Sequence, residues 1–332
     1  MKSLIQTLVE TPSPSGYEKQ IREVVRTEVL PLADEVRVDN LGNLIARKGQ
    51  RGTGGHKIML AAHIDEIGII ATHIDENGFV RFLPIGGVRP RTCPGGRVRF
   101  LNGTLGVIGT ERLKDAGKTP SFEQMFIDLG VESRNDCPVK VGDLAVFERP
   151  FVDLGQRLVS KAMDDRIGVA VLIETMRQIS HSPHEINFVF SVQEEVGIRG
   201  ATAAAYGLDP DIGMAVDVTM VGDTPNGVKM EVGLGKGPAI KVRDGGMLSD
   251  PRIVDWMVQA AEGADIPYQL EVLERGSTDA RAIQLTRAGV PAGCLSIPCR
   301  YLHTPSEMVD YDDAENAVKL LVELLGNPVD LE

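Results

Sequence analysis

Apolar and polar positions alternate along this chain in two rhythms that together predict an α/β fold. Short apolar runs, the length of buried strands, occupy residues 58–62, 186–192, 212–218 and 293–297. Around them, apolar residues at helical spacing predict helices at 164–179, 199–206, 251–261, 278–286 and 311–325, with two further helices before residue 30. Buried strands separated by amphipathic helices are typical of a mainly parallel or mixed sheet sandwiched between helices.

The stretch from residue 71 to 153 has a different texture. Glycine and proline recur every few residues, and Asp75-Glu-Asn-Gly78 is typical of a hairpin turn. Alternating apolar residues at 97–100, 104–109 and 143–147 predict short antiparallel strands. Because 332 residues exceed what one core usually organises, we expect two domains. Residues 1–70 plus 154–332 would form the larger one, with 71–153 inserted as a small β-barrel.

Composition narrows the range of partners and compartments. The net charge is -12, with 47 acidic against 35 basic residues, which argues against nucleic acid or an anionic membrane as a partner. No apolar stretch reaches the length of a membrane span, and residues 1–16 do not resemble a signal peptide. The four cysteines show no Cys-x-x-Cys spacing. We therefore expect a reduced, cytoplasmic protein.

Polar side chains gather where the predicted strands end. His63 and Asp65 follow the first buried strand, and Asp164 begins a predicted helix. The carboxyl ends of parallel strands meet at one edge of a sheet, where sites form. The remaining candidates follow or end the other three strands: Glu194, Glu195, Asp217 and His303.

Residue types at this edge predict a metal site. Asp164, Glu195 and Asp217 supply three negative charges, which two divalent cations and one bridging hydroxide would balance, and His63 and His303 add neutral nitrogens. Histidine combined with carboxylate suits zinc first, with cobalt or manganese as alternatives. This leaves Glu194 free to act as a general base. Asp65, two residues from His63 on an extended chain, is placed to orient that imidazole.

Each residue alone has a simpler explanation. His63 is consistent with a hydrogen-bonded core histidine, Asp164 with a helix N-cap, and Asp217 with a strand-end turn. His303 could be a loop histidine before proline, and the Glu194-Glu195 pair a solvated strand end. Their common placement at one edge favours the metal site.

Six strings spread over nearly the whole chain match one known family: Ala-His-Ile-Asp-Glu-Ile-Gly (62–68), Lys-Ala-Met-Asp-Asp-Arg (161–166), Gln-Glu-Glu-Val-Gly-Ile-Arg-Gly-Ala (193–201), Val-Asp-Val-Thr (216–219), Ser-Thr-Asp-Ala (277–280) and Ile-Pro-Cys-Arg-Tyr-Leu-His-Thr-Pro-Ser-Glu (297–307). In these strings the chain resembles the family of tetrahedral (TET-type) dinuclear metallo-aminopeptidases, which includes glutamyl aminopeptidases and proteins labelled endoglucanase. The resemblance implies that Asp164 bridges two metals, that His63 and Asp217 complete one site, and that Glu195 and His303 complete the other. It further implies Glu194 as the base, Asp65 behind His63, and assembly of dimers into a hollow dodecamer through the inserted barrel.

The resulting hypothesis is removal of N-terminal residues from peptides, by attack of a metal-bridging water that gives its proton to Glu194. A two-metal carboxypeptidase or deacylase on a related fold is the nearest alternative. Endoglucanase activity is disfavoured because one tryptophan and five tyrosines offer few aromatic platforms for a sugar. The two carboxylates of a glycosidase must also flank the sugar, whereas Glu194 and Glu195 are neighbours in the sequence. A non-catalytic assembly module or peptide-binding chaperone is a third alternative. Four arginines are candidates for lining the pocket that receives the N-terminal side chain, although a surface or salt-bridged arginine is the simpler interpretation of each: Arg243, Arg275, Arg281 and Arg300.

Overall fold

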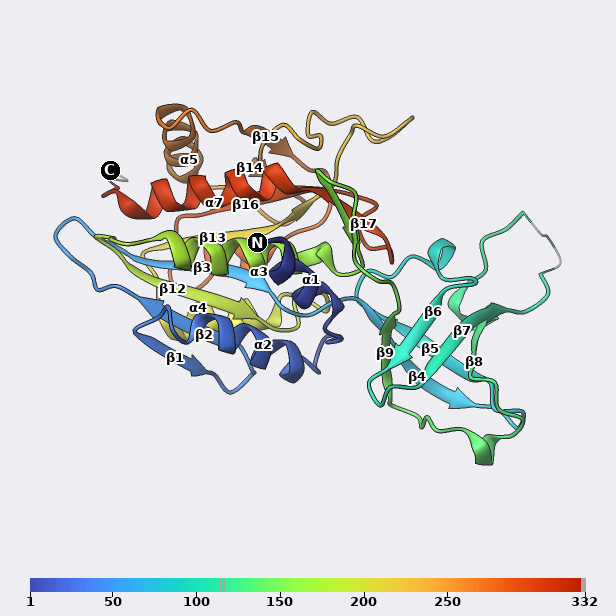
Figure 1. The fold of residues 1–332 in the computed structure, drawn as a ribbon. Coiled ribbons are helices and arrows are strands. Elements are labelled where there is room, and N and C mark those ends of the chain that lie inside the picture. The colour runs from blue at the N-terminus through green and yellow to red at the C-terminus, as the bar shows by residue number, and fades with distance from the viewer. Residues whose placement is uncertain (114, 116, 330–332) are drawn as a thin grey trace.

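A computed structural model describes residues 1–113, 115 and 117–329 (Figure 1). Two bodies of secondary structure stand out, an α/β sandwich and a six-stranded closed barrel. The predicted fold class is confirmed: a mixed sheet packed between helices with an inserted antiparallel barrel. None of the helices in the described ranges combines the length and apolar character needed to cross a bilayer.

The sandwich is built on an 11-stranded sheet with the order β1-β2-β12-β3-β13-β16-β17-β11-β10, with β14 pairing β16 and β15. Its four central strands, β12, β3, β13 and β16, run parallel, and the outer strands join them antiparallel, apart from the parallel β14–β15 pair. The strands are β1 (Glu35–Val38), β2 (Leu44–Lys48), β3 (Lys57–His63), β10 (Val152–Asp153), β11 (Arg157–Ser160), β12 (Glu185–Ser191), β13 (Ile212–Thr219), β14 (Ala239–Arg243), β15 (Gln269–Val272), β16 (Ala292–Arg300) and β17 (Glu307–Asp310).

Helices cover both faces of this sheet because alternate strand residues are apolar on both sides. Ile58, Leu60 and Ala62 of β3 pack in one core with residues of five helices, whereas Met59 and Ala61 pack on the opposite face against α4 and α6. The first face carries α1 (Lys2–Glu10), α2 (Lys19–Val29), α3 (Met163–Gln178), α5 (Pro251–Gly263) and α7 (Tyr311–Gly326), and the second carries α4 (Arg199–Leu208) and α6 (Asp279–Gln284).

The barrel has its own apolar interior, formed by residues such as Val80, Phe100 and Ile127. Hairpin turn chemistry at Asp75–Gly78 is as predicted, because Asp75 and Phe79 pair across the turn between β4 and β5. The barrel strands lie between Gly68 and Phe147, so they begin just before the expected insertion; the domain division itself stays a prediction. They are β4 (Gly68–Ile74), β5 (Val80–Ile85), β6 (Arg97–Phe100), β7 (Leu105–Thr110), β8 (Met125–Asp128) and β9 (Leu144–Phe147), in the order β4-β5-β8-β7-β6-β9.

Candidate metal centre

The carboxyl ends of the four central parallel strands bring the predicted residues to one edge of the sheet. His63 is the last residue of β3, and Asp217 lies two residues before the end of β13. Glu194 and Glu195 follow β12, and His303 follows β16. Since these strands are neighbours in the order β12-β3-β13-β16, the fold places their ends together, as expected for a parallel sheet.

Asp164 lies between the two histidines. Its Oδ1 is 2.9 Å from His63 Nε2, and its Oδ2 is 3.1 Å from His303 Nε2. Asp164 belongs to the first turn of α3 but has a non-helical backbone, with ψ 105°. Each oxygen of one carboxylate therefore faces a different imidazole, an arrangement suited to bridging two cations.

Two overlapping groups of possible ligands result. One consists of His63, Asp164 and Asp217, and the other of Asp164, Glu195 and His303, and within each group the ligand atoms lie within 4.8 Å of one another. Asp164 is common to both groups. The structure thus brings together the five residues predicted as ligands, with donor types that suit zinc, cobalt or manganese.

The electrostatics of these carboxylates fit a cation. Within the described ranges, the ion-pair partners of Asp164, Glu194 and Glu195 are histidines, and no lysine or arginine pairs with them. Burial and the charge of Asp164 raise the pKa of Glu195 to about 7, and burial raises the pKa of Asp217 well above its usual range. Glu195 Oε1 is also buried without a hydrogen-bond partner. Divalent cations would satisfy this orphaned oxygen and offset the buried charge.

Protons and metal cations compete for the imidazole nitrogens of His63 and His303. Burial opposes protonation of His303, but its hydrogen bond to Asp164 raises its pKa to about 10. The pKa of His63 is also raised, against burial, by the hydrogen bond to Asp164. A metal would therefore have to displace a proton from these imidazole nitrogens, which makes metal affinity depend on pH.

Glu194 stands beside these groups without belonging to either. Its Oε2 is 3.9 Å from His63 Nε2, and its side chain is 12% exposed. Burial is the main cause that raises the pKa of Glu194, and the charge of Asp217 adds to it. A carboxyl group with a raised pKa next to a reaction site is suited to accepting and returning a proton.

Asp65 lies behind His63, as the sequence predicted, although the closer contact is through its backbone. His63 Nδ1 is 3.1 Å from the Asp65 carbonyl oxygen and 3.5 Å from Asp65 Oδ1. The Asp65 carboxylate also accepts the Ser15 hydroxyl at 2.6 Å and the backbone N–H groups of Glu194 and Glu195 at 3.0 and 3.2 Å. One buried side chain therefore positions both a histidine and the Glu194-Glu195 pair.

Two supporting carboxylates were missed from the sequence. Asp165 accepts the His63 N–H at 3.2 Å, and Glu307 accepts the N–H groups of Asp164 at 3.0 Å and His303 at 2.8 Å. Glu307 falls within one of the matching strings, but its contact with Asp164 spans 143 positions and leaves no local pattern. Only the adjacency of Asp165 to Asp164 offered a signal.

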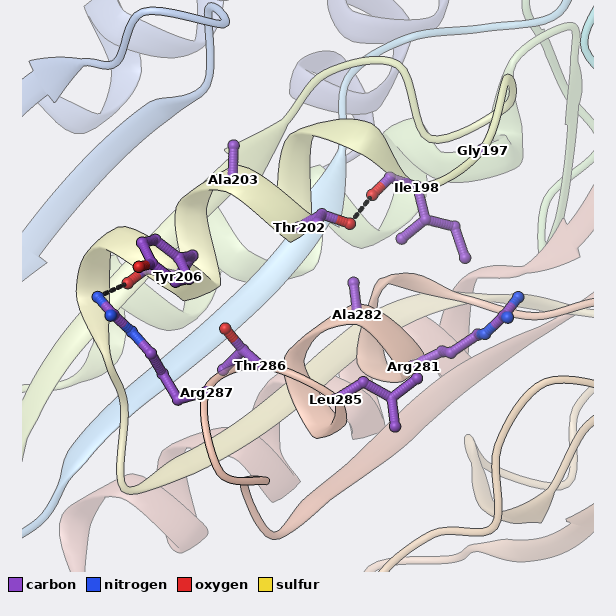
Figure 2. A pocket seen from close by; sticks show the side chains of 10 residues that line it. All are labelled: Gly197, Ile198, Thr202, Ala203, Tyr206, Arg281, Ala282, Leu285, Thr286 and Arg287. Atoms are coloured by element: carbon purple, nitrogen blue, oxygen red, sulfur yellow. Dashed lines mark hydrogen bonds between the residues drawn. The ribbon is translucent and has the colours of Figure 1, made fainter.

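The ligand groups open into a cavity of about 330 Å³. A larger cavity of about 730 Å³ lies beside it between α4 and α6 (Figure 2). Gly197 and Ile198 line both cavities, but none of the predicted metal ligands, nor Glu194 or Asp65, lines the larger one. Its far end holds the guanidinium of Arg287 over the Tyr206 ring. The chemistry therefore belongs to the smaller cavity. Its lining comprises His63, Gly87, Asp164, Glu194, Glu195, Gly197, Ile198, Asp217, Val218, Thr219, Lys241, Leu273, Gly276, Ser277, Thr278, Leu302 and His303.

The barrel contributes one wall of this cavity through the segment after β5. The Gly87 N–H is 3.4 Å from Glu195 Oε2, and a Cβ at Gly87 would stand 2.1 Å from His303 Nδ1. Gly86 has a φ of +72°, and a Cβ there would meet Glu195 Oε2 at 2.8 Å. Two glycines are needed here because the backbone approaches the ligands too closely for any side chain.

Comparisons with known proteins agree with this geometry. The model of the M42 glutamyl aminopeptidase family matches residues 42–320. A lysyl aminopeptidase of Pyrococcus furiosus is 37% identical over 97% of this chain and 96% of its own length. Among solved structures, aminopeptidase APDkam598 from Desulfurococcus kamchatkensis has a TM-score of 0.94 at 40% identity, covering 98% of this chain and 94% of its own. The Pyrococcus horikoshii TET1 peptidase, which can assemble into a tetrahedron or a large octahedral shell, has a TM-score of 0.88 at 33% identity over 98% of each chain.

Proposed function

The chain belongs to the M42 glutamyl aminopeptidase family and is a metallo-aminopeptidase, and from this premise we propose that it removes N-terminal residues from peptides with two divalent cations and a glutamate base. The observation that carries the proposal is the position of Asp164, whose two oxygens face His63 and His303 at 2.9 and 3.1 Å. A single carboxylate shared by two ligand groups is what a dinuclear centre requires.

The ligands divide between the two cations by proximity. His63 and Asp217 would hold one, Glu195 and His303 the other, and Asp164 would bridge them, in agreement with the two groups of ligand atoms. Zinc is our first expectation for this donor set, with cobalt or manganese as alternatives. When bound, such cations would polarise the substrate carbonyl and lower the pKa of a coordinated water toward about 7.

Glu194 would act as the general base and then as the general acid. Its carboxylate lies beside the ligands without belonging to either group, so it is free to take the proton from the attacking water. The same proton then goes to the departing amine as the peptide bond breaks. The carboxylate of Asp65 supports this role, because it fixes the Glu194 backbone through a 3.0 Å hydrogen bond.

A Glu194→Gln variant tests the assignment. Glutamine keeps the size of the side chain but cannot accept the proton, so turnover of an aminoacyl anilide should fall by about 100-fold or more while metal content stays at the wild-type level. The matched control is Glu274→Gln, because Glu274 is exposed and should tolerate the same change. If Glu194→Gln retains near-full turnover, Glu194 is not the base.

For assembly, we propose that the barrel joins subunits into dimers and then a tetrahedral dodecamer. The support is the assemblies of the TET1 relative and the exposed apolar side chains on the barrel, which include Leu105 and Val107 at 49% and 47% exposure. Mass in solution should correspond to a dodecamer and should fall in a Leu105→Asp/Val107→Asp variant. An unchanged mass in that variant would place the contacts elsewhere. A cytoplasmic location, and the absence of nucleic-acid or membrane partners, stay predictions.

A further inference from the structure

A buried ion pair outside the ligand set forms part of the reaction cavity. Lys241 on β14 and Glu271 on β15 are direct partners in the register of these parallel strands, and Lys241 Nζ contacts Glu271 Oε1. Their side chains are 1% and 0% exposed. Lys241 lines the cavity that holds the candidate ligands, whereas Glu271 lies behind it.

Lys241 is the only lysine or arginine among the described residues that line this cavity. None of the four arginines considered from the sequence lines this cavity. Arg281 lines the larger cavity in Figure 2, and Arg300 pairs with Asp223 through two contacts of 2.8 Å. Any recognition of a charged substrate side chain by a protein cation at this point must therefore involve Lys241.

The charge of Lys241 is already compensated. Glu271 Oε1 contacts Lys241 and also accepts the Thr219 hydroxyl at 2.7 Å. A buried ammonium is costly without such a partner, so a substrate carboxylate would have to compete with Glu271 for it. The next carboxylate, Asp244, is held by the N–H groups of Gly246 and Met247 at 2.8 Å.

The remaining surroundings disfavour both charge signs. Glu194 is not one of the proposed ligands, so its charge would oppose a substrate carboxylate in the cavity, and a substrate ammonium would meet Lys241 before it could reach Glu271. Apolar contacts come from Ile198, Leu273 and Leu302. A side chain one bond from the Cα of the reacting residue has to be accommodated in this same cavity.

On the basis of the proposed function, we propose that this cavity selects uncharged aliphatic N-terminal residues, and that the Lys241–Glu271 pair is the device that excludes acidic ones. Because the charges of Lys241 and Glu271 cancel, this part of the cavity wall carries no net charge. The substrate side chain would then be recognised by its shape and by apolar contacts. Removing the Glu271 charge alone would release the Lys241 ammonium to bind a substrate carboxylate.

The test compares kcat/KM for leucyl, glutamyl and lysyl p-nitroanilides. Wild type should turn over the leucyl substrate at least tenfold better than the other two. Glu271→Gln keeps an acceptor for Thr219 but frees Lys241, so the glutamyl-to-leucyl ratio should rise by about tenfold or more. Glu274→Gln, an exposed glutamate three residues further along, should leave the ratio unchanged.

A second variant guards against misfolding. Lys241→Met/Glu271→Gln removes both charges and should cancel the gain for the glutamyl substrate, so that the glutamyl-to-leucyl ratio of kcat/KM returns to about the wild-type value. An unchanged ratio in Glu271→Gln, or a wild-type preference for either charged residue, would overturn the inference while leaving the aminopeptidase proposal intact.

Calorimetry of the binding of free leucine and free glutamate distinguishes the proposed aminopeptidase function from the proposed selectivity of the cavity. Leucine should bind wild type more tightly than glutamate, and Glu271→Gln should narrow that difference. If no anilide is turned over but this binding pattern holds, the proposed function fails and the selectivity of the cavity stands. If the binding difference is absent, the inference fails.

Discussion

The carboxylate of Asp65 holds the backbone of Glu194: Asp65 Oδ1 accepts the Glu194 N–H at 3.0 Å. Asp65 Oδ2 accepts the next N–H, that of Glu195, at 3.2 Å. Asp65 itself is fully buried. The proposed base and one proposed ligand are therefore oriented by a side chain that also contacts His63.

An Asp65→Asn variant should lower kcat more than KM. The amide oxygen can replace only one of the two oxygens that accept the N–H groups of Glu194 and Glu195, so the pair would lose its fixed orientation. Substitution of such supporting groups usually costs about 10–100-fold in activity or metal affinity. Steady-state kinetics with saturating metal separates a loss of activity from a loss of metal affinity. An unchanged kcat would show that Asp65 does not position the base.

Metal content should distinguish the shared ligand from an unshared one. Asp164→Ala removes the side chain common to both ligand groups, so the purified protein should lose both cations. Asp217→Ala removes a member of one group only, and about one cation per subunit should remain. Elemental analysis gives the stoichiometry, and equal losses in the two variants would argue against Asp164 as the bridge.

Gly87→Ala should disturb one half of the centre selectively. A Cβ at this position would stand 2.1 Å from His303 Nδ1, which forces the imidazole or the barrel segment to move. We expect loss of the cation held by Glu195 and His303, retention of the other, and a large fall in turnover. Gly207→Ala in α4 is the control, since a Cβ there meets no atom within 4 Å and, as at Gly87, the backbone φ is not positive. Full metal content in Gly87→Ala would contradict the close approach.

Acid should weaken the barrel through one ion pair. Arg99 contacts both oxygens of Glu148 at 2.7 Å, and this pairing is the main cause that lowers the pKa of Glu148. A lowered folded-state pKa means that the stabilisation is present above the ordinary value of 4.5 and is lost as pH falls below it. Because both side chains are partly exposed, at 37% and 29%, Glu148→Gln should cost only about 0.5–1 kcal/mol at pH 7.

The measurement for that pair is the free energy of unfolding against pH for wild type and Glu148→Gln. The difference between the two proteins should shrink below pH 4.5. Glu132→Gln, an exposed barrel glutamate, serves as the control and should follow wild type throughout. A difference that persists unchanged into acid would exclude the ion pair as its source.

The central sheet was predictable because its strands are short apolar runs that sequence alone distinguishes from amphipathic helices. The same pattern located His63, Asp217 and the Glu194-Glu195 pair, because parallel strands present their carboxyl ends together. β14 was missed since Lys241 interrupts its apolar pattern, and a buried lysine reads as an exposed one until its partner is known. β11 and β17 are four-residue strands whose pairing across about 150 positions has no local signature.

The supporting interactions of the site were hidden for the same reason. Glu307 and Asp165 act through hydrogen bonds to backbone N–H groups, and any residue type offers such a donor. Nothing in the residue types at positions 63 or 164 therefore indicates which distant carboxylate accepts from them. The charge state of the substrate cavity depends likewise on the Lys241–Glu271 register, which only the folded sheet defines.

The segment that contains Gly87 leads out of β5, so the six-stranded barrel is directly connected to a backbone that packs against His303. Nothing larger than a hydrogen atom fits between them, so a tilt of the barrel toward the sheet would push the imidazole aside. If neighbouring subunits grip the barrel, docking would then steady the centre, and loading the centre would in turn strengthen docking by the same free energy. Subunit association and metal loading would then rise and fall together.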